Sequence, residues 1–494
     1  MITVQLNRAD FEYDIHSLVK AFFPSEEVSV RVGKQETQEE ISFHIVTNYL
    51  EDSIEIILEC QKDMCSVSDK EEKPKQKRVI PVDFSDRKET KNRLKKAYYQ
   101  MLCEYTKKQL PWGTLTGIRP TKIPMAFLEE GKDEAFIRNF MKKSYFASDE
   151  KIDLSIEVAK RELSLLQKLD YENGYSLYIG IPFCPSTCLY CSFTSYPIGM
   201  WEKRIDDYLK ALEKEIDFTA ERFKEKHLNT VYIGGGTPTT LQPKQLKRLI
   251  GRIKSSFDLS GCLEFTVEAG RPDSITREKL EVLREEGISR ISINPQTMNE
   301  ETLKIIGRRH TVEDTARRFS LARELGFDNI NMDLIVGLPG ETFLDVKATM
   351  DQIVPLDPDN LTVHSLALKR AARLKMNWEE YQHMTFENTN ETIALTADYA
   401  KQMDMTPYYL YRQKNMAGNF ENVGYAKAGK AGIYNILIME EVQDIVACGA
   451  GAISKRVYPG GRIERCENVK DLAQYMERID EMIERKKKLF KEEL

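Results

Sequence analysis

Three cysteines lie close together in the sequence, at Cys184, Cys188 and Cys191. Their spacing is C-x3-C-x2-C, and no fourth cysteine lies nearby. Thiolates this near to one another can surround one compact metal centre, and an iron–sulfur cubane normally takes four cysteine ligands. Three ligands would leave one iron open to another molecule, and an open coordination position is typical of a reactive metal centre rather than a structural one.

Two other interpretations of these cysteines fit the sequence less well. Structural zinc sites usually combine two C-x2-C pairs, or one pair with histidines at short spacing. The chain has no second pair, and the next histidine is His227. A disulfide framework is disfavoured because nine cysteines in 494 residues are sparse and odd in number. We expect the other six to be ordinary buried cysteines rather than ligands of a second cluster.

Composition and charge narrow the class of protein. A length of 494 residues predicts roughly two to four domains. A hydrophobic content of 41% with 30% charged residues is typical of a soluble globular protein, and the net charge of −6 gives no overall attraction to nucleic acid. The sequence shows neither a secretory signal nor an apolar run of bilayer length. We therefore expect a cytoplasmic protein with no membrane partner.

The first part of the chain reads as an α+β domain over residues 1–108, followed by a helical linker region over 109–170. Stretches rich in β-branched residues predict four strands, at Ile2–Leu6, Val28–Val32, Ile41–Thr47 and Ile54–Leu58. The polar, charged segment Lys62–Arg78 predicts a solvated loop. Apolar residues at helical spacing predict a long helix over Asp86–Lys108.

Apolar strands alternate with amphipathic helices from residue 171 to about residue 375. The expected strands are Leu177–Phe183, Thr230–Ile233, Leu263–Ala269, Ile288–Asn294, Asn329–Val336 and Asn360–Leu366. The expected helices are Glu202–Lys226, Pro243–Phe257, Thr276–Glu286, Val312–Leu325 and Phe343–Ile353. A repeated strand-then-helix order indicates parallel strands with right-handed crossovers, and six such units suffice for a partial barrel.

The remaining residues, 376–494, show a mixed pattern that predicts a further α+β region. A helix is expected at Glu391–Met403, strands at Pro407–Tyr411 and Asp444–Cys448, and a last helix at Val469–Lys487.

Polar residues stand at several strand ends of the predicted barrel. A glycine run, Gly234–Thr239, follows the second strand, and Glu268, Gln296 and Asp333 lie at or near the ends of the third, fourth and fifth. The carboxyl ends of such strands carry the functional residues of barrels, and the cysteine loop follows the first strand. Each polar residue could instead be a satisfied buried group, and the glycines a tight turn. Together they indicate a polar ligand.

These motifs resemble the radical S-adenosylmethionine (SAM) superfamily, of which the C-x3-C-x2-C loop is the hallmark. Four stretches are similar to the oxygen-independent coproporphyrinogen III oxidase family, namely Tyr178–Cys184, Gly234–Thr239, Gly307–Thr311 and Asp333–Pro339. The segment Leu110–Pro120 is similar to the HemZ-type branch. The resemblance implies an α/β fold, with a partial (β/α)6 barrel between an N-terminal α+β domain and a C-terminal α+β extension.

The resemblance also implies the cofactors and their ligands. Cys184, Cys188 and Cys191 would hold three irons of a 4Fe–4S cluster, and the fourth iron would take the amino and carboxylate groups of SAM. Tyr178 would be a catalytic residue beneath the cluster loop. The residues implied to contact SAM are Gly235, Gly236, Thr237, Glu268, Gln296, Arg308 and Asp333.

By the same resemblance, the activity would be oxidative decarboxylation of the propionates of coproporphyrinogen III to vinyl groups. The partners would be a porphyrinogen or haem-like tetrapyrrole and a low-potential electron donor such as flavodoxin or ferredoxin. Arginines that could bind propionate carboxylates are Arg119, Arg370, Arg373 and Arg412.

Two positions depart from the family pattern and keep other functions open. Gly180 stands where the family usually has a histidine, and Phe193 stands where the decarboxylating oxidases carry a fourth cysteine. The second departure is shared with a branch of haem-binding chaperones that use the same cluster and SAM. A radical SAM methyltransferase that degrades haem is a further alternative.

Overall fold

The computed structural model describes residues 1–494 except 25, 34–42, 61–75, 118, 414–419 and 492–494. The chain divides into two compact units. The first contains Met1–Glu157 and Arg412–Glu421, and the second contains Val158–Tyr411 and Asn422–Leu494. The division falls within helix α5 (Asp149–Leu166). The boundaries expected at residues 108, 170 and 375 stay predictions.

The first unit contains a five-stranded sheet in the order β2-β1-β3-β4-β5. Its strands are β1 (Ile2–Leu6), β2 (Val28–Val32), β3 (Phe43–Tyr49), β4 (Ser53–Cys60) and β5 (Gln76–Pro81). Apolar side chains of the sheet pack against α1 (Glu12–Phe22) and α2 (Arg87–Thr106) in one core. Two further helices, α3 (Lys122–Glu129) and α4 (Glu134–Tyr145), precede α5.

Strand β5 corrects the expectation of a loop that reached Arg78. Residues 62–75 of that loop lie outside the described residues, but Gln76 begins a strand that pairs antiparallel with β4. The strand stands at the edge of the sheet and alternates exposed and half-buried positions. Charged side chains are usual on the exposed face of an edge strand, so this one looks like a solvated loop in the sequence.

The second unit contains an eleven-stranded sheet, in the order β14-β15-β13-β12-β11-β10-β9-β6-β16-β17-β18. The six strands predicted for the barrel are all present and parallel to their neighbours, which confirms the fold class. They are β6 (Gly174–Ile181), β9 (His227–Gly235), β10 (Glu264–Gly270), β11 (Arg290–Ile293), β12 (Ile330–Val336) and β13 (Asn360–Ser365).

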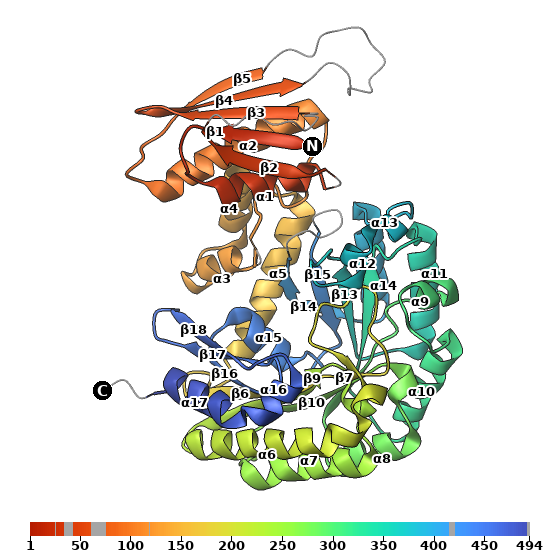
Figure 1. Ribbon diagram of the computed structural model, residues 1–494. Coiled ribbons are helices and arrows are strands. Elements are labelled where there is room, and N and C mark those ends of the chain that lie inside the picture. The colour runs from red at the N-terminus through yellow and green to blue at the C-terminus, as the bar shows by residue number, and fades with distance from the viewer. Residues whose placement is uncertain (25, 34–42, 61–75, 118, 414–419, 492–494) are drawn as a thin grey trace. The chain divides into compact units, whose positions relative to one another are not determined.

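Five amphipathic helices follow one another around the outside of this curved sheet (Figure 1). They are α6 (Ile205–Arg222), α7 (Pro243–Ser256), α8 (Arg277–Glu285), α10 (Val312–Glu324) and α11 (Phe343–Ile353). Their buried residues recur at helical spacing, as Leu246, Leu249, Ile250 and Ile253 do in α7, so each helix covers apolar strand residues. Within the described residues, no helix is both long enough and apolar enough to cross a bilayer.

The C-terminal part of the chain extends the same sheet at both edges. Strand β15 (Asn422–Ala426) pairs antiparallel with β13, and β14 (Thr406–Tyr411) pairs antiparallel with β15. Strand β16 (Asp444–Cys448) pairs parallel with β6 and is followed by β17 (Ile453–Val457) and β18 (Ile463–Glu467). The strand that leads into the cysteine loop therefore lies between β9 and a strand from the end of the chain.

Shorter elements complete the unit, and one expected helix is interrupted. These elements are β7 (Phe183–Cys184), β8 (Tyr196–Pro197), α9 (Glu300–Ile305), α12 (Arg373–Met376), α13 (Trp378–Tyr381), α14 (Asn390–Gln402) and α15 (Ile433–Glu440). The single helix predicted over Val469–Lys487 is two, α16 (Leu472–Glu477) and α17 (Ile479–Leu489). Arg478, which separates them, leaves the helical conformation at φ −109°.

A buried ion pair joins the last helix, α17, to helix α6 of the barrel. Lys486 of α17 pairs with Glu215 of α6, and both side chains are almost wholly buried. Glu215 also accepts hydrogen bonds from the backbone N–H of Gly449 (2.7 Å), from Tyr475 (2.6 Å) and from Asn468 (2.7 Å). Burial would lower the pKa of Lys486, but Glu215 outweighs it and raises that pKa. Lys486 is therefore charged at neutral pH.

Replacing Lys486 with Met should strongly destabilise the second unit, because it leaves the Glu215 carboxylate buried without its cation. Breaking such a pair costs about 3–5 kcal/mol. Urea denaturation would measure the loss. The adjacent Lys487→Met variant is the control, since Lys487 is exposed and its ion pair with Glu484 lies at the surface. Equal midpoints for the two variants would contradict the assignment.

Candidate functional site

The three cysteines lie in a loop that the fold closes by backbone hydrogen bonds. The loop begins in β7, which pairs with β8 on its far side. In its middle, Leu189 donates to the carbonyl of Ile306 (3.0 Å) and accepts from the N–H of Leu374 (2.9 Å). Two other segments of the barrel thus hold the cysteine loop, at the carboxyl end of β6, as the sequence predicts.

The sulfur atoms do not form a site for a single ion. In the part of the chain that the structure describes, no three His, Cys, Asp or Glu side chains converge on one metal position. In a cluster each cysteine binds a different iron, so convergence on one point is not required. Burial raises the pKa of Cys184 to about 11 and also raises that of Cys191. These thiols are neutral at pH 7 unless a metal displaces their protons.

The glycine run after β9 packs directly on the start of the cysteine loop. Gly236 donates to the carbonyl of Ile181 (2.9 Å), and Thr237 donates to that of Phe183 (2.7 Å). A Cβ atom on Gly236 would stand 2.6 Å from the Phe183 oxygen, so only glycine permits this approach. Gly235 adopts φ 104°, which also requires glycine. The hydroxyl of Thr237 lies 3.4 Å from the sulfur of Cys184.

The two acidic residues of the barrel differ in their charge. Glu268 lies near the end of β10 (Glu264–Gly270), next to the glycine run, and burial raises its pKa to about 7 despite a hydrogen bond from Tyr232. Burial would also raise the pKa of Asp333, but His364 and Asn331 outweigh it and hold that pKa below the ordinary value. At neutral pH, Asp333 is ionised and Glu268 is close to half ionised.

Gln296 and Arg308 present buried polar atoms beside the same strand ends. Gln296 follows β11 in the left-handed conformation (φ 69°), which is strained for any residue but glycine. Its side-chain oxygen is buried without a hydrogen-bond partner among the described residues. Arg308 donates to the carbonyl of Asn294 (2.5 Å) and to Tyr190 of the cysteine loop (3.3 Å).

Tyr178 lies inside the barrel and not in the loop. Its hydroxyl would be 3.0 Å from a Cβ atom on Gly235, so it adjoins the glycine run. Its ring stacks on that of Tyr232 (centroids 6.2 Å apart), which stacks in turn on Tyr434 (4.4 Å). Burial raises the pKa of Tyr178, so its hydroxyl is neutral at physiological pH.

The structure adds residues that the sequence reasoning missed. Tyr232 contacts Glu268, and Arg271 contacts the cysteine loop. The position of Tyr232 in the sequence could have indicated its role. It stands two residues before the glycine run, on a strand whose inward-facing side chains can bring a hydroxyl group to the site. Arg271 stands three residues after Glu268 and looks like an ordinary loop arginine in the sequence.

Unpartnered buried atoms allow a test of whether a polar ligand fits. Buried polar groups in proteins almost always have partners. At these strand ends, several atoms find none among the described residues: the Gln296 oxygen, Nε of Arg308, both ring nitrogens of His310 and the hydroxyl of Ser292. SAM carries a carboxylate, an ammonium group and a ribose diol, and so offers partners for amide, guanidinium and carboxylate groups. The residues present fit such a ligand.

Comparison with known proteins shows the superfamily to which the chain belongs. Residues 178–353 match the radical SAM superfamily. The chain is 42% identical over 404 residues to the oxygen-independent coproporphyrinogen-III oxidase-like protein HemZ of Bacillus subtilis, a match that covers 81% of each chain. It is also 42% identical over 198 residues to the haem chaperone HemW of that organism, covering 39% of this chain and 51% of HemW.

A solved structure agrees with these matches. Coproporphyrinogen III oxidase (HemN) from Escherichia coli, described as a radical SAM enzyme, is 25% identical, with a TM-score of 0.51 over 65% of this chain and 73% of its own. The cysteine loop, the strand-end residues and the long match to HemZ lead to one conclusion: the chain belongs to the radical SAM superfamily, in the family of the HemZ-type oxygen-independent coproporphyrinogen III oxidase-like proteins.

Proposed function

We propose that this protein is a radical SAM enzyme that decarboxylates propionate side chains of a porphyrinogen, coproporphyrinogen III, to vinyl groups. The observation that carries the proposal is the meeting of the cysteine loop, the glycine run and unpartnered buried polar atoms at one end of the barrel. The substrate class follows from the similarity to HemZ and HemN, whose names refer to coproporphyrinogen III oxidase.

In this proposal, Cys184, Cys188 and Cys191 hold a 4Fe–4S cluster with SAM beside it. When bound, the cluster and SAM supply a carbon-centred radical that can take a hydrogen atom from an unactivated C–H bond. The protein has to bind, orient and enclose the reactants. The rings of Tyr178, Tyr232 and Tyr434 stack on one another and give the site an apolar surface next to the glycine run.

The polar strand ends bind the groups of SAM in complementary pairs. The guanidinium of Arg308 and the amide of Gln296 suit the methionine carboxylate, because a charged donor and a neutral donor can share its two oxygens. Glu268 and Asp333 suit hydroxyl donors of the ribose. Gly235 and Gly236, with Thr237, leave room for the methionine amino end next to the cysteine loop.

Two arginines near the cysteine loop suit the carboxylates of the substrate. Arg373, in α12, is exposed and donates to the carbonyl of Thr187 in the loop (3.3 Å). Arg370 is exposed three residues earlier. Their guanidinium forks can bind propionates bidentately. Arg412 is buried and donates to the carbonyl of Leu115 (2.6 Å), so we do not assign it to the substrate, and Arg119 stays a prediction.

An anaerobic assay with reconstituted protein tests this function. With SAM, a reduced low-potential donor and coproporphyrinogen III, we expect vinyl products and CO2, from protein with about four irons per chain. Cys188→Ala should abolish SAM cleavage, because one iron loses its ligand. Unchanged SAM cleavage in this variant would rule out the cluster assignment. Absence of vinyl product in a protein that cleaves SAM would rule out the substrate.

Phe193 favours a second candidate function, that of a haem chaperone. Its side chain is 76% exposed at the position where decarboxylating oxidases carry a fourth cysteine, and the chain matches HemW over the 198 residues already noted. Haem titration of the reconstituted protein separates the two candidates. Tight haem binding without turnover of coproporphyrinogen III would support the chaperone.

SAM binding should strengthen as pH rises through the pKa of Glu268. That pKa lies at about 7, so the ionised form, which accepts hydrogen bonds from hydroxyl groups, increases from pH 6 to pH 8. We expect the dissociation constant for SAM to fall about tenfold across that range. Calorimetric titration would measure it. Glu268→Gln is the matched control, and an equal pH dependence in this variant would contradict the prediction.

A further inference from the structure

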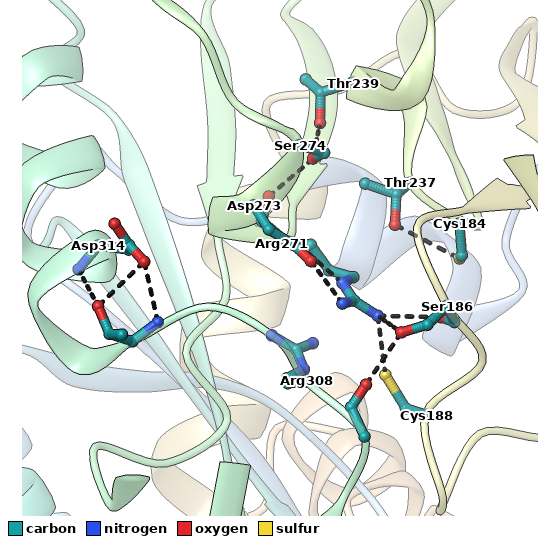
Figure 2. A network of polar contacts seen from close by, with 12 residues as sticks. Cys184, Ser186, Cys188, Thr237, Thr239, Arg271, Asp273, Ser274, Arg308 and Asp314 are labelled. Carbon is teal, nitrogen blue, oxygen red and sulfur yellow. Dashed lines mark hydrogen bonds and ion pairs between the residues drawn. The ribbon is translucent and has the colours of Figure 1, made fainter. Parts of the chain in front are cut away.

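Arg271 is a buried cation whose side chain reaches the cysteine loop (Figure 2). It follows β10 and is only 3% exposed. Its Nε and Nη2 atoms form a fork on the two carboxylate oxygens of Asp273, at 3.0 and 2.6 Å. The remaining nitrogen, Nη1, donates to the carbonyl and hydroxyl oxygens of Ser186, both at 2.9 Å, and lies 3.7 Å from the sulfur of Cys188.

The local backbone fixes the direction of this side chain. Pro272 begins a short 3-10 turn, Pro272–Ser274, directly after Arg271. The hydroxyl of Ser274 donates to the carbonyl of Arg271 (2.7 Å) and contacts the hydroxyl of Thr239 (2.6 Å). The turn is thereby tied to the glycine run. With its backbone braced and one edge held by Asp273, the guanidinium keeps Nη1 directed at the loop (Figure 2).

Two of the three sulfurs therefore have a hydrogen-bond donor from a neighbouring strand end. Cys184 contacts the neutral hydroxyl of Thr237 (3.4 Å), and Cys188 contacts the charged Nη1 of Arg271. Arg308 also donates to the cysteine loop, at the hydroxyl of Tyr190 (3.3 Å). Arg308, however, is among the residues suited to SAM, whereas Arg271 is fully engaged with Asp273 and the loop.

Hydrogen bonds and positive charge at cluster sulfurs raise the reduction potential, because they favour the more negative reduced state. We propose that Arg271 donates a hydrogen bond to the Cys188 thiolate and raises the reduction potential of the cluster, with Asp273 as the counter-charge that limits the increase. This inference rests on the proposed cluster and adds a residue that tunes it. A higher potential makes reduction by the electron donor easier.

The test is the midpoint potential of the reconstituted cluster, followed by electron paramagnetic resonance in a redox titration without SAM or substrate. Arg271→Gln removes the cation and its N–H···S bond. We expect its reduction equilibrium to weaken about tenfold, which is a downward shift of ~59 mV for a one-electron couple. Its iron content should remain that of the wild type, because Arg271 is not a ligand.

The paired variant, Asp273→Asn, should shift the potential in the opposite direction, since it removes the negative charge and leaves the cation. Ser186→Ala removes the hydroxyl contacts with Arg271 and with the carbonyl of Gly307 (2.9 Å) but no charge, and should leave the potential unchanged. A residue that merely braced the loop would not give shifts of opposite sign. Equal potentials in wild type, Arg271→Gln and Asp273→Asn would overturn the proposal.

Arg271→Lys keeps the test decisive if Arg271→Gln fails to retain iron. Lysine keeps a cation but cannot form the fork with Asp273 and donate to the loop together, so its potential should lie below that of the wild type. A potential equal to the wild type would contradict the proposal. Failure of wild-type protein to take up iron, or to cleave SAM, would instead contradict the proposed function.

Discussion

The close approach of the glycine run to the backbone of the cysteine loop is the constraint on which the site depends. Gly236 and Thr237 donate to the carbonyls of Ile181 and Phe183, and a single methyl group on Gly236 would push the two segments apart. This contact fixes where the loop leaves β6. The hydroxyl of Thr237 then reaches one sulfur, and the neighbouring strand end brings Arg271 to another.

Neighbouring groups, rather than burial alone, decide the charge of each acid in the barrel. Glu268 and Asp333 are both enclosed, and burial raises the pKa of any carboxyl group. His364 and Asn331 outweigh the effect of burial at Asp333, whereas the hydroxyl of Tyr232 and the backbone N–H of Gly235 do not outweigh it at Glu268. One barrel thus provides a permanent anion and a carboxyl group that titrates near neutral pH.

The sequence predicted those elements whose signal is local. The parallel strands are buried on both faces, so they read as continuous apolar runs, and the helices between them have clear amphipathic faces. Strands β15, β17 and β18 were not predicted. Most residues of β17 and β18 are exposed or half-buried, so neither strand shows an apolar run, and β15 pairs with β13, which is distant in sequence. The side chain of Arg271 was also beyond prediction, since its contacts join residues 85 positions apart.

The pairing of β6 with β16 has a consequence for the order of events during synthesis. Strand β6 lies near residue 180, but its neighbour β16 comes from Asp444–Cys448. The ion pair of Lys486 with Glu215, whose carboxylate binds the backbone N–H of Gly449 just after β16, forms later still. While the chain is still being made, β6 is the open edge of an unfinished sheet, which is prone to pair with other chains. The sheet edge beside the strand that leads into the cysteine loop is therefore complete only after residues 444–448 have been made.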